Sequence, residues 1–304
     1  MLNQVETGKM IGREAAGLLD LSLRHVRRIL AAYKKEGAAA LAHGNRGRKP
    51  YHALDGSLRK QVLELAQTIY TGCNNQHFTE LLAEREGITL SRSSLRRILL
   101  EAGIKSPRKR RPPKHRSRRE RYPQEGMLLQ TDGSCHDWLE GRGPYLTLVG
   151  AIDDATGEVP YGLFREQEDA QGYSLLLRQI VASHGIPVAL YHDGHGVFER
   201  SKREPESLEE QLEGKRKPTQ FGRLMEELGI TSIPSRSPQA RGRIERLWGT
   251  FQDRLVSELR IAEAKTLEEA NQVLWDFLPR YNQRFVVPAA QAGSAYRQPE
   301  EGFI

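Results

Sequence analysis

From residue 126 onward, the chain alternates short apolar runs with stripes of apolar residues at helical spacing. Five apolar or alternating runs predict strands, at residues 127–131, 145–152, 159–164, 188–191 and 231–234. Apolar positions three and four apart predict helices at residues 169–184 and 219–228, a helix that starts at Ser237-Pro238, and a last one from 266 to about 281. This part of the chain is therefore predicted to be a mixed α/β domain.

The pattern before residue 105 is helical throughout. Residues 13–19 and 23–35 predict two helices around a turn that ends at Ser22, a good N-cap. The second helix has one apolar face and is otherwise basic, as a recognition helix must be to clamp phosphates and reach base edges. A plain helical pair with a solvated basic face is the alternative. Residues 55–104 predict a second helical unit, whose last helix is closed by Gly103.

Basic side chains outside the predicted cores are the candidates for contact with DNA. Those of residues 44–50 lie in a flexible arm, and those near residue 110 lie in the linker 105–121, where ten of seventeen residues are Lys or Arg and three prolines favour an extended chain. Such a charge run is expected to order on a polyanion. The candidates are Arg24, Arg27, Arg28, Arg46, Arg48, Arg92, Arg96, Arg97, Arg108, Lys109, Arg110, Arg111, Arg241 and Arg243.

Three acidic residues stand out in this basic chain. Asp132 and Asp193 each follow an apolar run and precede glycine, which predicts a carboxylate at the end of a buried strand. Glu245 lies beside the apolar stripe of the helix that follows Ser237, on the edge expected to face a core. Because Mg²⁺ prefers carboxylate oxygens, these side chains together predict a divalent-metal site for phosphoryl transfer.

Each acid also has a plainer interpretation. Asp-Gly after an apolar run is often a turn, and a helical glutamate among arginines is often a solvated ion-pair partner. Asp153 and Asp154 precede Thr-Gly and are assigned to a hairpin turn rather than to a metal site. His192 and His195 flank the second aspartate, and a structural role is favoured for both over a contact with substrate.

Length, net charge, cysteine content and missing motifs limit the classes of function that the protein can have. A length of 304 residues predicts two or three domains, and a net charge of +7 with a pI near 9.4 favours a polyanionic partner, although charge also serves solubility. Two distant cysteines, Cys73 and Cys135, argue against a disulfide framework and a paired-cysteine zinc site. The sequence contains no phosphate-binding loop of the Gly-x-x-x-x-Gly-Lys-Ser/Thr type and no apolar run of membrane-spanning length. We expect a cytoplasmic protein without a nucleotide cofactor or a membrane partner.

The string Ser-Pro-Gln-Ala-Arg-Gly-Arg-Ile-Glu-Arg at residues 237–246 is the most specific motif. With it, residues 127–285 resemble the catalytic core of retroviral-integrase-type DDE transposases. The whole chain is similar to bacterial insertion-sequence transposases of the ISNCY group. Asp132, Asp193 and Glu245 match the family's acidic triad, and Phe198 matches the aromatic that follows the second Asp. A Tyr-Asn-x-x-Arg signature matches residues 281–284. A charged insertion at residues 199–217, interpreted as a surface loop or an extra helix, lengthens the interval before Glu245.

The resemblance implies an α/β ribonuclease-H-like catalytic core, a mixed five-stranded sheet with helices, preceded by all-α helix-turn-helix DNA-binding domains. The implied boundaries are a helix-turn-helix at 1–50, a second helix-turn-helix or winged-helix-like domain at 51–104, a basic linker at 105–124, the core at 125–285 and a tail at 286–304.

The implied activity is DNA cleavage at the ends of an insertion sequence, followed by strand transfer. It uses two Mg²⁺ (or Mn²⁺) ions held by the triad and acts on double-stranded DNA, both element ends and target, as a homo-oligomer in the bacterial nucleoid. A transcription regulator with a ligand-sensing α/β domain is one alternative. A truncated, inactive relative that only binds DNA is another.

Overall fold

The structure is a computed structural model that describes residues 1–42, 47, 54–107, 119–200, 207, 210–211, 216–235 and 241–299. The chain divides into two compact units, Met1–Arg59 and Lys60–Ile304. The predicted domain boundary at residue 50 and the predicted division of the remaining chain into four segments stay predictions. Within the described ranges, none of the helices combines the length and the apolar character that a membrane span requires.

The first unit is a small helical bundle. It contains α1 (Leu2–Glu6), α2 (Gly12–Leu19), α3 (Leu23–Glu36) and a 3₁₀ helix, η1 (Gly37–Leu41). The Ser22 side chain caps α3 by accepting a hydrogen bond from the backbone N–H of His25 at 3.2 Å. The core of this helical bundle is formed by Ala15, Ala16 and Val26. The α2–turn–α3 segment confirms the helix-turn-helix predicted from the sequence.

Three further helices follow: α4 (Gly56–Gln67), α5 (Asn75–Arg85) and α6 (Arg92–Glu101). Asn74 and Ser91 cap α5 and α6 through their side-chain oxygens. Gly103 follows α6 with a φ of +77°, the left-handed conformation that closes a helix, as expected.

The second unit contains a mixed sheet in the order β3-β2-β1-β4-β5. Its strands are β1 (Leu129–His136), β2 (Leu146–Asp153), β3 (Gly162–Arg165), β4 (Ala189–His192) and β5 (Thr231–Pro234). The first three strands form an antiparallel meander, whereas β4 and β5 are parallel to β1. This five-stranded order and mixed direction confirm the expected ribonuclease-H-like architecture.

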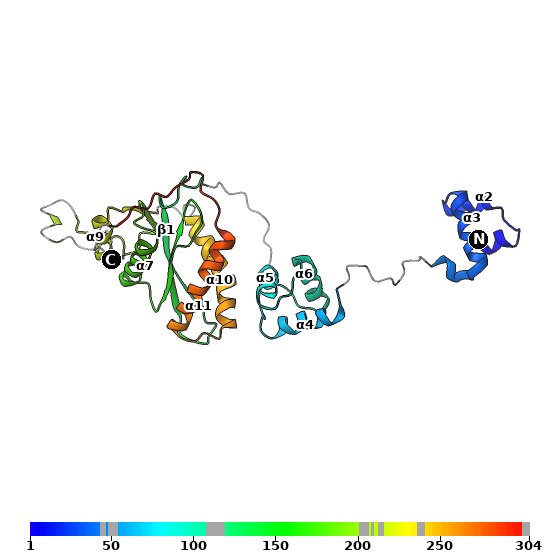
Figure 1. The fold of residues 1–304 in the computed structure, drawn as a ribbon, viewed down its shortest axis with the longest axis horizontal. Helices are drawn as coiled ribbons and strands as arrows, with labels where there is room; N and C mark the ends of the chain where they lie inside the picture. Colours follow the sequence, from blue (N-terminus) through cyan, green and yellow to red (C-terminus); the bar gives the residue numbers. More distant parts are fainter. Residues whose placement is uncertain are drawn as a thin grey trace. The chain divides into compact units, whose positions relative to one another are not determined.

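Helices cover both faces of the sheet (Figure 1). One face packs on α7 (Ala170–Ser183) and α9 (Gln220–Glu227), and the other on α10 (Gly242–Ile261) and α11 (Leu267–Phe285). β2 is buried along its whole length. Its side chains point alternately to the two faces of the sheet, so Leu148 packs in the apolar layer with α10 and α11, whereas Val149 packs in the layer with α7. The sheet is thus a fixed platform between two apolar layers.

Two elements extend beyond their predicted ends. β1 was expected to stop at residue 131, but it pairs with β2 as far as His136, so Asp132 lies inside the strand. The prediction failed because Asp132-Gly133 forms no turn here: pairing with β2 continues through both residues. The last helix was expected to end near Tyr281, yet α11 includes Pro279 and continues to Phe285, since tertiary packing of Phe277, Leu278 and Tyr281 outweighs the missing backbone N–H.

Helix α5 contacts helices α10 and α11 of the α/β domain through charged groups. The buried carboxylate of Glu258 on α10 accepts from His77 at 3.0 Å, Arg85 at 2.5 Å and Arg280 at 3.2 Å. Glu80 on α5 pairs with both Arg254 and Arg284. A further hydrogen bond at 2.7 Å joins the Asn74 amide to Asp253. This contact is therefore electrostatic in character rather than apolar.

Candidate active site

Asp132 is the most buried acid of the predicted triad. It is 8% exposed and stands on β1 opposite Gly150 of β2. Its Oδ2 accepts a hydrogen bond from the indole N–H of Trp248 at 3.3 Å and pairs with Nη2 of Arg241 at 2.6 Å. Burial raises the pKa of Asp132, and the neighbouring Arg241 and Trp248 partly offset the effect. The protein therefore maintains an acid in a site that disfavours an isolated negative charge.

Asp193 reaches the same region through the parallel pairing of β1 with β4. Gln130 of β1 lies in register with Tyr191 of β4. Asp132 comes two residues after Gln130, and Asp193 comes two residues after Tyr191. Asp193 follows the end of β4, as expected, and its side chain is 27% exposed. Its Oδ1 accepts from the backbone N–H of His195 at 2.8 Å. The sheet thus places two carboxylates beside each other although 60 residues separate them in sequence.

His192 and Phe198 support the turn that carries Asp193. His192 is fully buried, lies at 2.8 Å from the Ser232 hydroxyl through Nε2, and accepts from the backbone N–H of Gly194 through Nδ1. Burial lowers the pKa of His192 to about 4, so the ring is neutral near pH 7. Phe198 stacks on this ring with centroids 4.1 Å apart. The structural role favoured for His192 agrees with these contacts, whereas His195 is exposed.

The guanidinium of Arg241 lies between the two aspartates. Besides its contact with Asp132, its Nη1 lies 3.9 Å from Oδ2 of Asp193. Its Nε is buried and has no hydrogen-bond partner among the described residues. The cation of Arg241 therefore pairs closely with Asp132 and lies near Asp193, so it offsets part of the negative charge of the two carboxylates.

Glu245 differs from its predicted setting. It lies in the first turn of α10, but its side chain is exposed rather than turned toward a core. The reason is helical geometry: Ile244, Leu247 and Trp248 occupy the buried stripe, which leaves position 245 outside it. Glu245 still acts electrostatically on Arg241, four residues earlier. Within the described ranges, no three acidic, His or Cys side chains form a ready-made metal cluster.

Asp154 organises a second group of ion pairs beside the site. This fully buried carboxylate pairs with Arg119, accepts from Arg243 Nε at 2.6 Å, and accepts from the backbone N–H of Tyr122 at 2.8 Å. Asp153, at the end of β2, caps the following turn through Thr156. Both acids lie where the sequence assigned them, at the β2 end and its turn. Arg243 is engaged inside the core, and its predicted contact with DNA stays a prediction.

Sequence reasoning missed two supporting groups. Trp248 was identified as a core residue, not as a donor to Asp132; no one-dimensional signal marks that role. Glu168 accepts from the Tyr173 hydroxyl at 2.6 Å and packs over Gly133, where an added Cβ would lie 2.5 Å from the carboxylate. The glycine after Asp132 was the available signal, since a glycine inside a strand often marks a close approach.

Apart from Arg241 and Arg243, described above, the predicted DNA-contacting residues fall into three groups. Arg24, Arg27 and Arg28 are exposed on α3. Arg46, Arg48 and the linker residues Arg108, Lys109, Arg110 and Arg111 lie outside the described residues. Arg92, Arg96 and Arg97 are exposed on α6.

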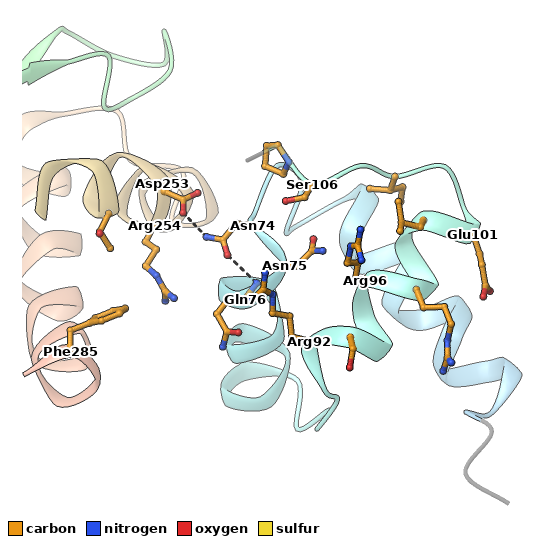
Figure 2. Close-up of a pocket in the computed structure, with 16 residues that line it drawn as sticks. Asn74, Asn75, Gln76, Arg92, Arg96, Glu101, Ser106, Asp253, Arg254 and Phe285 are labelled. Atoms are coloured by element: carbon orange, nitrogen blue, oxygen red, sulfur yellow. Dashed lines mark hydrogen bonds between the residues drawn. The ribbon is translucent and has the colours of Figure 1, made fainter. Parts of the chain in front are cut away.

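The α6 arginines line a cavity of about 2340 Å³ (Figure 2). Its opposite wall carries Asp253 of α10 and Phe285 at the end of α11. Figure 2 shows Asn74 hydrogen-bonded to Asp253 at this cavity. α6 therefore presents exposed arginines to an open space beside α10 and α11.

Comparisons with known proteins agree with these features. Residues 4–60 match the winged helix-turn-helix family. The chain is 36% identical over 299 residues to y4bF of Sinorhizobium fredii, a candidate transposase, covering 98% of this chain and 63% of that protein. It is 35% identical over 320 residues to the transposase for insertion sequence IS1202 of Streptococcus pneumoniae, covering 94% of this chain and 67% of that protein. The chain thus spans about two thirds of the length of these relatives.

Solved structures with a similar course of the chain include retroviral proteins. A simian T-cell lymphotropic virus intasome, in complex with the PP2A regulatory subunit B56 gamma, matches over 80% of this chain and 79% of its own, at 16% identity and a TM-score of 0.41. The HTLV-2 integrase catalytic core domain, in complex with magnesium, matches over 50% of this chain and 84% of its own, at 15% identity and a TM-score of 0.36. On the sequence relationships, the chain belongs to the family of insertion-sequence transposases.

Proposed function

We propose that this protein is a DDE-type polynucleotidyl transferase that cleaves DNA at the ends of an insertion sequence and transfers those ends to target DNA. The observation that carries the proposal is the convergence of Asp132 and Asp193 from adjacent strands onto one cation. Family membership supports it, because transposases of this kind act on DNA. A ligand-sensing regulator gives no reason for a paired acidic site of this geometry.

The donor set fits a divalent metal. Asp132 and Asp193 offer the hard carboxylate oxygens that Mg²⁺ and Mn²⁺ prefer, and the space between them already accommodates the positive charge of Arg241. Asp132, Asp193 and Glu245 would together hold two such ions. When bound, such ions activate the attacking oxygen and stabilise the leaving oxygen of an in-line displacement.

The protein's own groups would position the reactants. In the first step, water attacks a phosphodiester at the element end, and the broken bond leaves a free 3′-OH. In the second step, that 3′-OH attacks a phosphodiester of the target, so one phosphodiester bond is exchanged for another. Trp248 and the buried β1 platform would hold Asp132 in place during both steps.

DNA recognition is assigned to the helical segments that precede the core. Arg24, Arg27 and Arg28 on α3, and Arg92, Arg96 and Arg97 on α6, would contact element ends, while the linker adds phosphate contacts. Arg241 and Arg243 would meet DNA near the site. We further propose a homo-oligomer assembled on DNA in the cytoplasm, within the bacterial nucleoid, and no nucleotide cofactor.

Triad substitution tests the proposal. The substrate is a duplex that carries the DNA flanking the gene, incubated with protein and Mg²⁺ or Mn²⁺. Asp132→Asn, Asp193→Asn and Glu245→Gln should each abolish cleavage and strand transfer, yet leave binding of the duplex within a few-fold. Asp276→Asn, which changes an acid on α11, is the matched control and should remain active. Activity in any triad variant would show that its assignment is wrong, and binding without cleavage by the wild type would favour the inactive relative.

A further inference from the structure

The Arg241 guanidinium occupies the position between two acids at which a bound cation is expected. It lies 2.6 Å from Asp132 and 3.9 Å from Asp193, whereas Glu245 is exposed. We infer that Arg241 is an internal cation that competes with the divalent ion for the Asp132–Asp193 pair and must leave before the metal site forms. This inference rests on the proposed metal-dependent function.

The need for an internal cation follows from burial and charge. Asp132 is 8% exposed, and the strand pairing places Asp193 nearby, so both carboxylates together would be costly without a positive neighbour. Trp248 provides one hydrogen bond to Asp132 but no charge. Arg241 supplies the charge and thus stabilises the metal-free site.

The contacts of Arg241 also make its departure feasible. It is the residue immediately before α10 and makes no side-chain capping bond, so the helix does not depend on its side chain. Its Nε has no hydrogen-bond partner among the described residues, and its contact with Asp193 is long. Among its contacts with the described residues, the short pair with Asp132 is the main one that Arg241 must break in order to leave.

Displacement would have a consequence for DNA. A guanidinium released from Asp132 remains tethered at the start of α10, beside the acids, and guanidinium groups bind phosphate through paired hydrogen bonds. Arg241 would then exchange a carboxylate for a DNA phosphate at the moment when the divalent ion takes its place. Arg241 would therefore pair with Asp132 when the divalent ion is absent and contact a DNA phosphate when the ion is bound.

Metal binding measured without DNA tests this competition. Full-length wild type, Arg241→Ala and Arg246→Ala are titrated with Mn²⁺ by calorimetry, and their melting temperatures are measured in EDTA and in saturating Mn²⁺. Arg246 is exposed on the same helix, so its substitution controls for the loss of one positive charge. Arg241→Gln, which retains hydrogen-bonding capacity without charge, is the second variant if the alanine variant does not fold.

We expect Arg241→Ala to bind Mn²⁺ about tenfold more tightly than wild type, a difference of about 1.4 kcal/mol. It should melt at a lower temperature than wild type in EDTA and recover most of that difference in Mn²⁺, while Arg246→Ala behaves like wild type. Equal Mn²⁺ affinity in wild type and Arg241→Ala, with binding lost in Asp132→Asn, would overturn the competition but leave the metal site standing. An equal gain in Arg246→Ala would also overturn it, because net charge alone would then explain the effect. Failure of wild type and Arg241→Ala alike to bind Mn²⁺ would overturn both the inference and the proposed metal site.

Discussion

Trp248 on α10 donates its indole N–H to Oδ2 of Asp132 on β1, across the boundary between helix layer and sheet. Gly150 makes this approach possible. It is the cross-strand partner of Asp132, and a Cβ added there would lie 3.0 Å from the indole ring of Trp248. The acid, the indole and the glycine therefore form one local arrangement drawn from three separate elements.

Replacing this indole should weaken the folded state. Trp248→Phe preserves most of the ring's apolar area but removes the donor, leaving a buried carboxylate with one partner fewer, at an expected loss of about 1–3 kcal/mol in unfolding free energy. Urea denaturation in EDTA measures this loss. Trp275→Phe is the control, because its indole donates to a neutral backbone oxygen and is more exposed. If the loss persists undiminished in an Asp132→Asn background, the contact with Asp132 is not its source.

The ion pairs between α5 and α10 should make stability depend on pH. Burial alone would raise the pKa of Glu258, but the hydrogen bond from His77 and the charges of Arg280 and Arg85 outweigh it and hold the pKa at about 2. Because this value lies below the usual 4.5, the stabilisation is complete above about pH 4.5 and is lost as the pH falls toward 2.

Glu258→Gln should accordingly lower the free energy of unfolding by about 3 kcal/mol at pH 7 and by clearly less at pH 3. Denaturant titrations of wild type and variant at both pH values give the comparison. Glu227→Gln removes an exposed carboxylate from α9 and should have little effect at either pH. A loss from Glu258→Gln that is equal at both pH values would show that ionisation of Glu258 does not carry the stabilisation.

The glycine after Asp132 should resist substitution. An alanine Cβ at position 133 would lie 2.5 Å from the Glu168 carboxylate, which must then move away from the Tyr173 hydroxyl. We expect Gly133→Ala to cost about 1–3 kcal/mol of stability and to slow DNA cleavage, because the strand that shifts carries Asp132. Thermal unfolding and the cleavage assay measure the two effects.

Gly249→Ala is the matched control. Gly249 lies inside α10, and nothing is within 4 Å of its added Cβ, so alanine should raise stability by roughly 0.5–1 kcal/mol. If both alanine variants behave alike, the packing of Glu168 over Gly133 has no energetic importance.

Recognition of an element end should depend on the exposed face of α3. Arg27→Ala and Arg28→Ala should each weaken binding of the end duplex, by about 1–3 kcal/mol where the side chain contacts a base. Fluorescence anisotropy on end and random duplexes provides the measurement, with Lys9→Ala as a control outside α3. Unchanged preference for the end duplex in both variants would place specificity elsewhere.

The linker should add affinity without sequence information. Arg119 and Arg121 contact Asp154 and Ala155 in the core, so the test variant changes only the eight Lys and Arg residues from Lys105 to Arg118 to Gln. If about half of them meet phosphates, the slope of log K against log salt should fall in magnitude by roughly three to four units, at about 0.9 per contact. Affinity for end and random duplexes should fall in parallel. An unchanged slope would mean that the segment is only a tether.

The sequence by itself determined the elements that local chemistry dictates. Ser22 and Thr266 predicted the starts of α3 and α11, and Gly103 the end of α6, because caps act within a few residues of chain. Apolar periodicity similarly identified all five strands and the buried stripe of α10. The apolar runs before each Asp-Gly and the motif at residues 237–246 indicated the three acids. The resemblance carried by these residues indicated the transposase family, and the catalytic roles of the acids stay a prediction.

Only the tertiary structure decided how these residues meet. The parallel register of Gln130 with Tyr191 brings Asp132 toward Asp193, and packing on the sheet brings Trp248 and Arg241 to the same carboxylate. The resemblance implied that the two aspartates meet, but the contacts of Trp248 and Arg241 with Asp132 join residues far apart in sequence, so no local pattern could reveal them. Tertiary contacts also explain two departures from the predicted structure. Pairing with β2 continues β1 through Gly133, where the sequence suggested a turn. The buried stripe of α10 determines which side of the helix faces solvent, and Glu245 lies on that side.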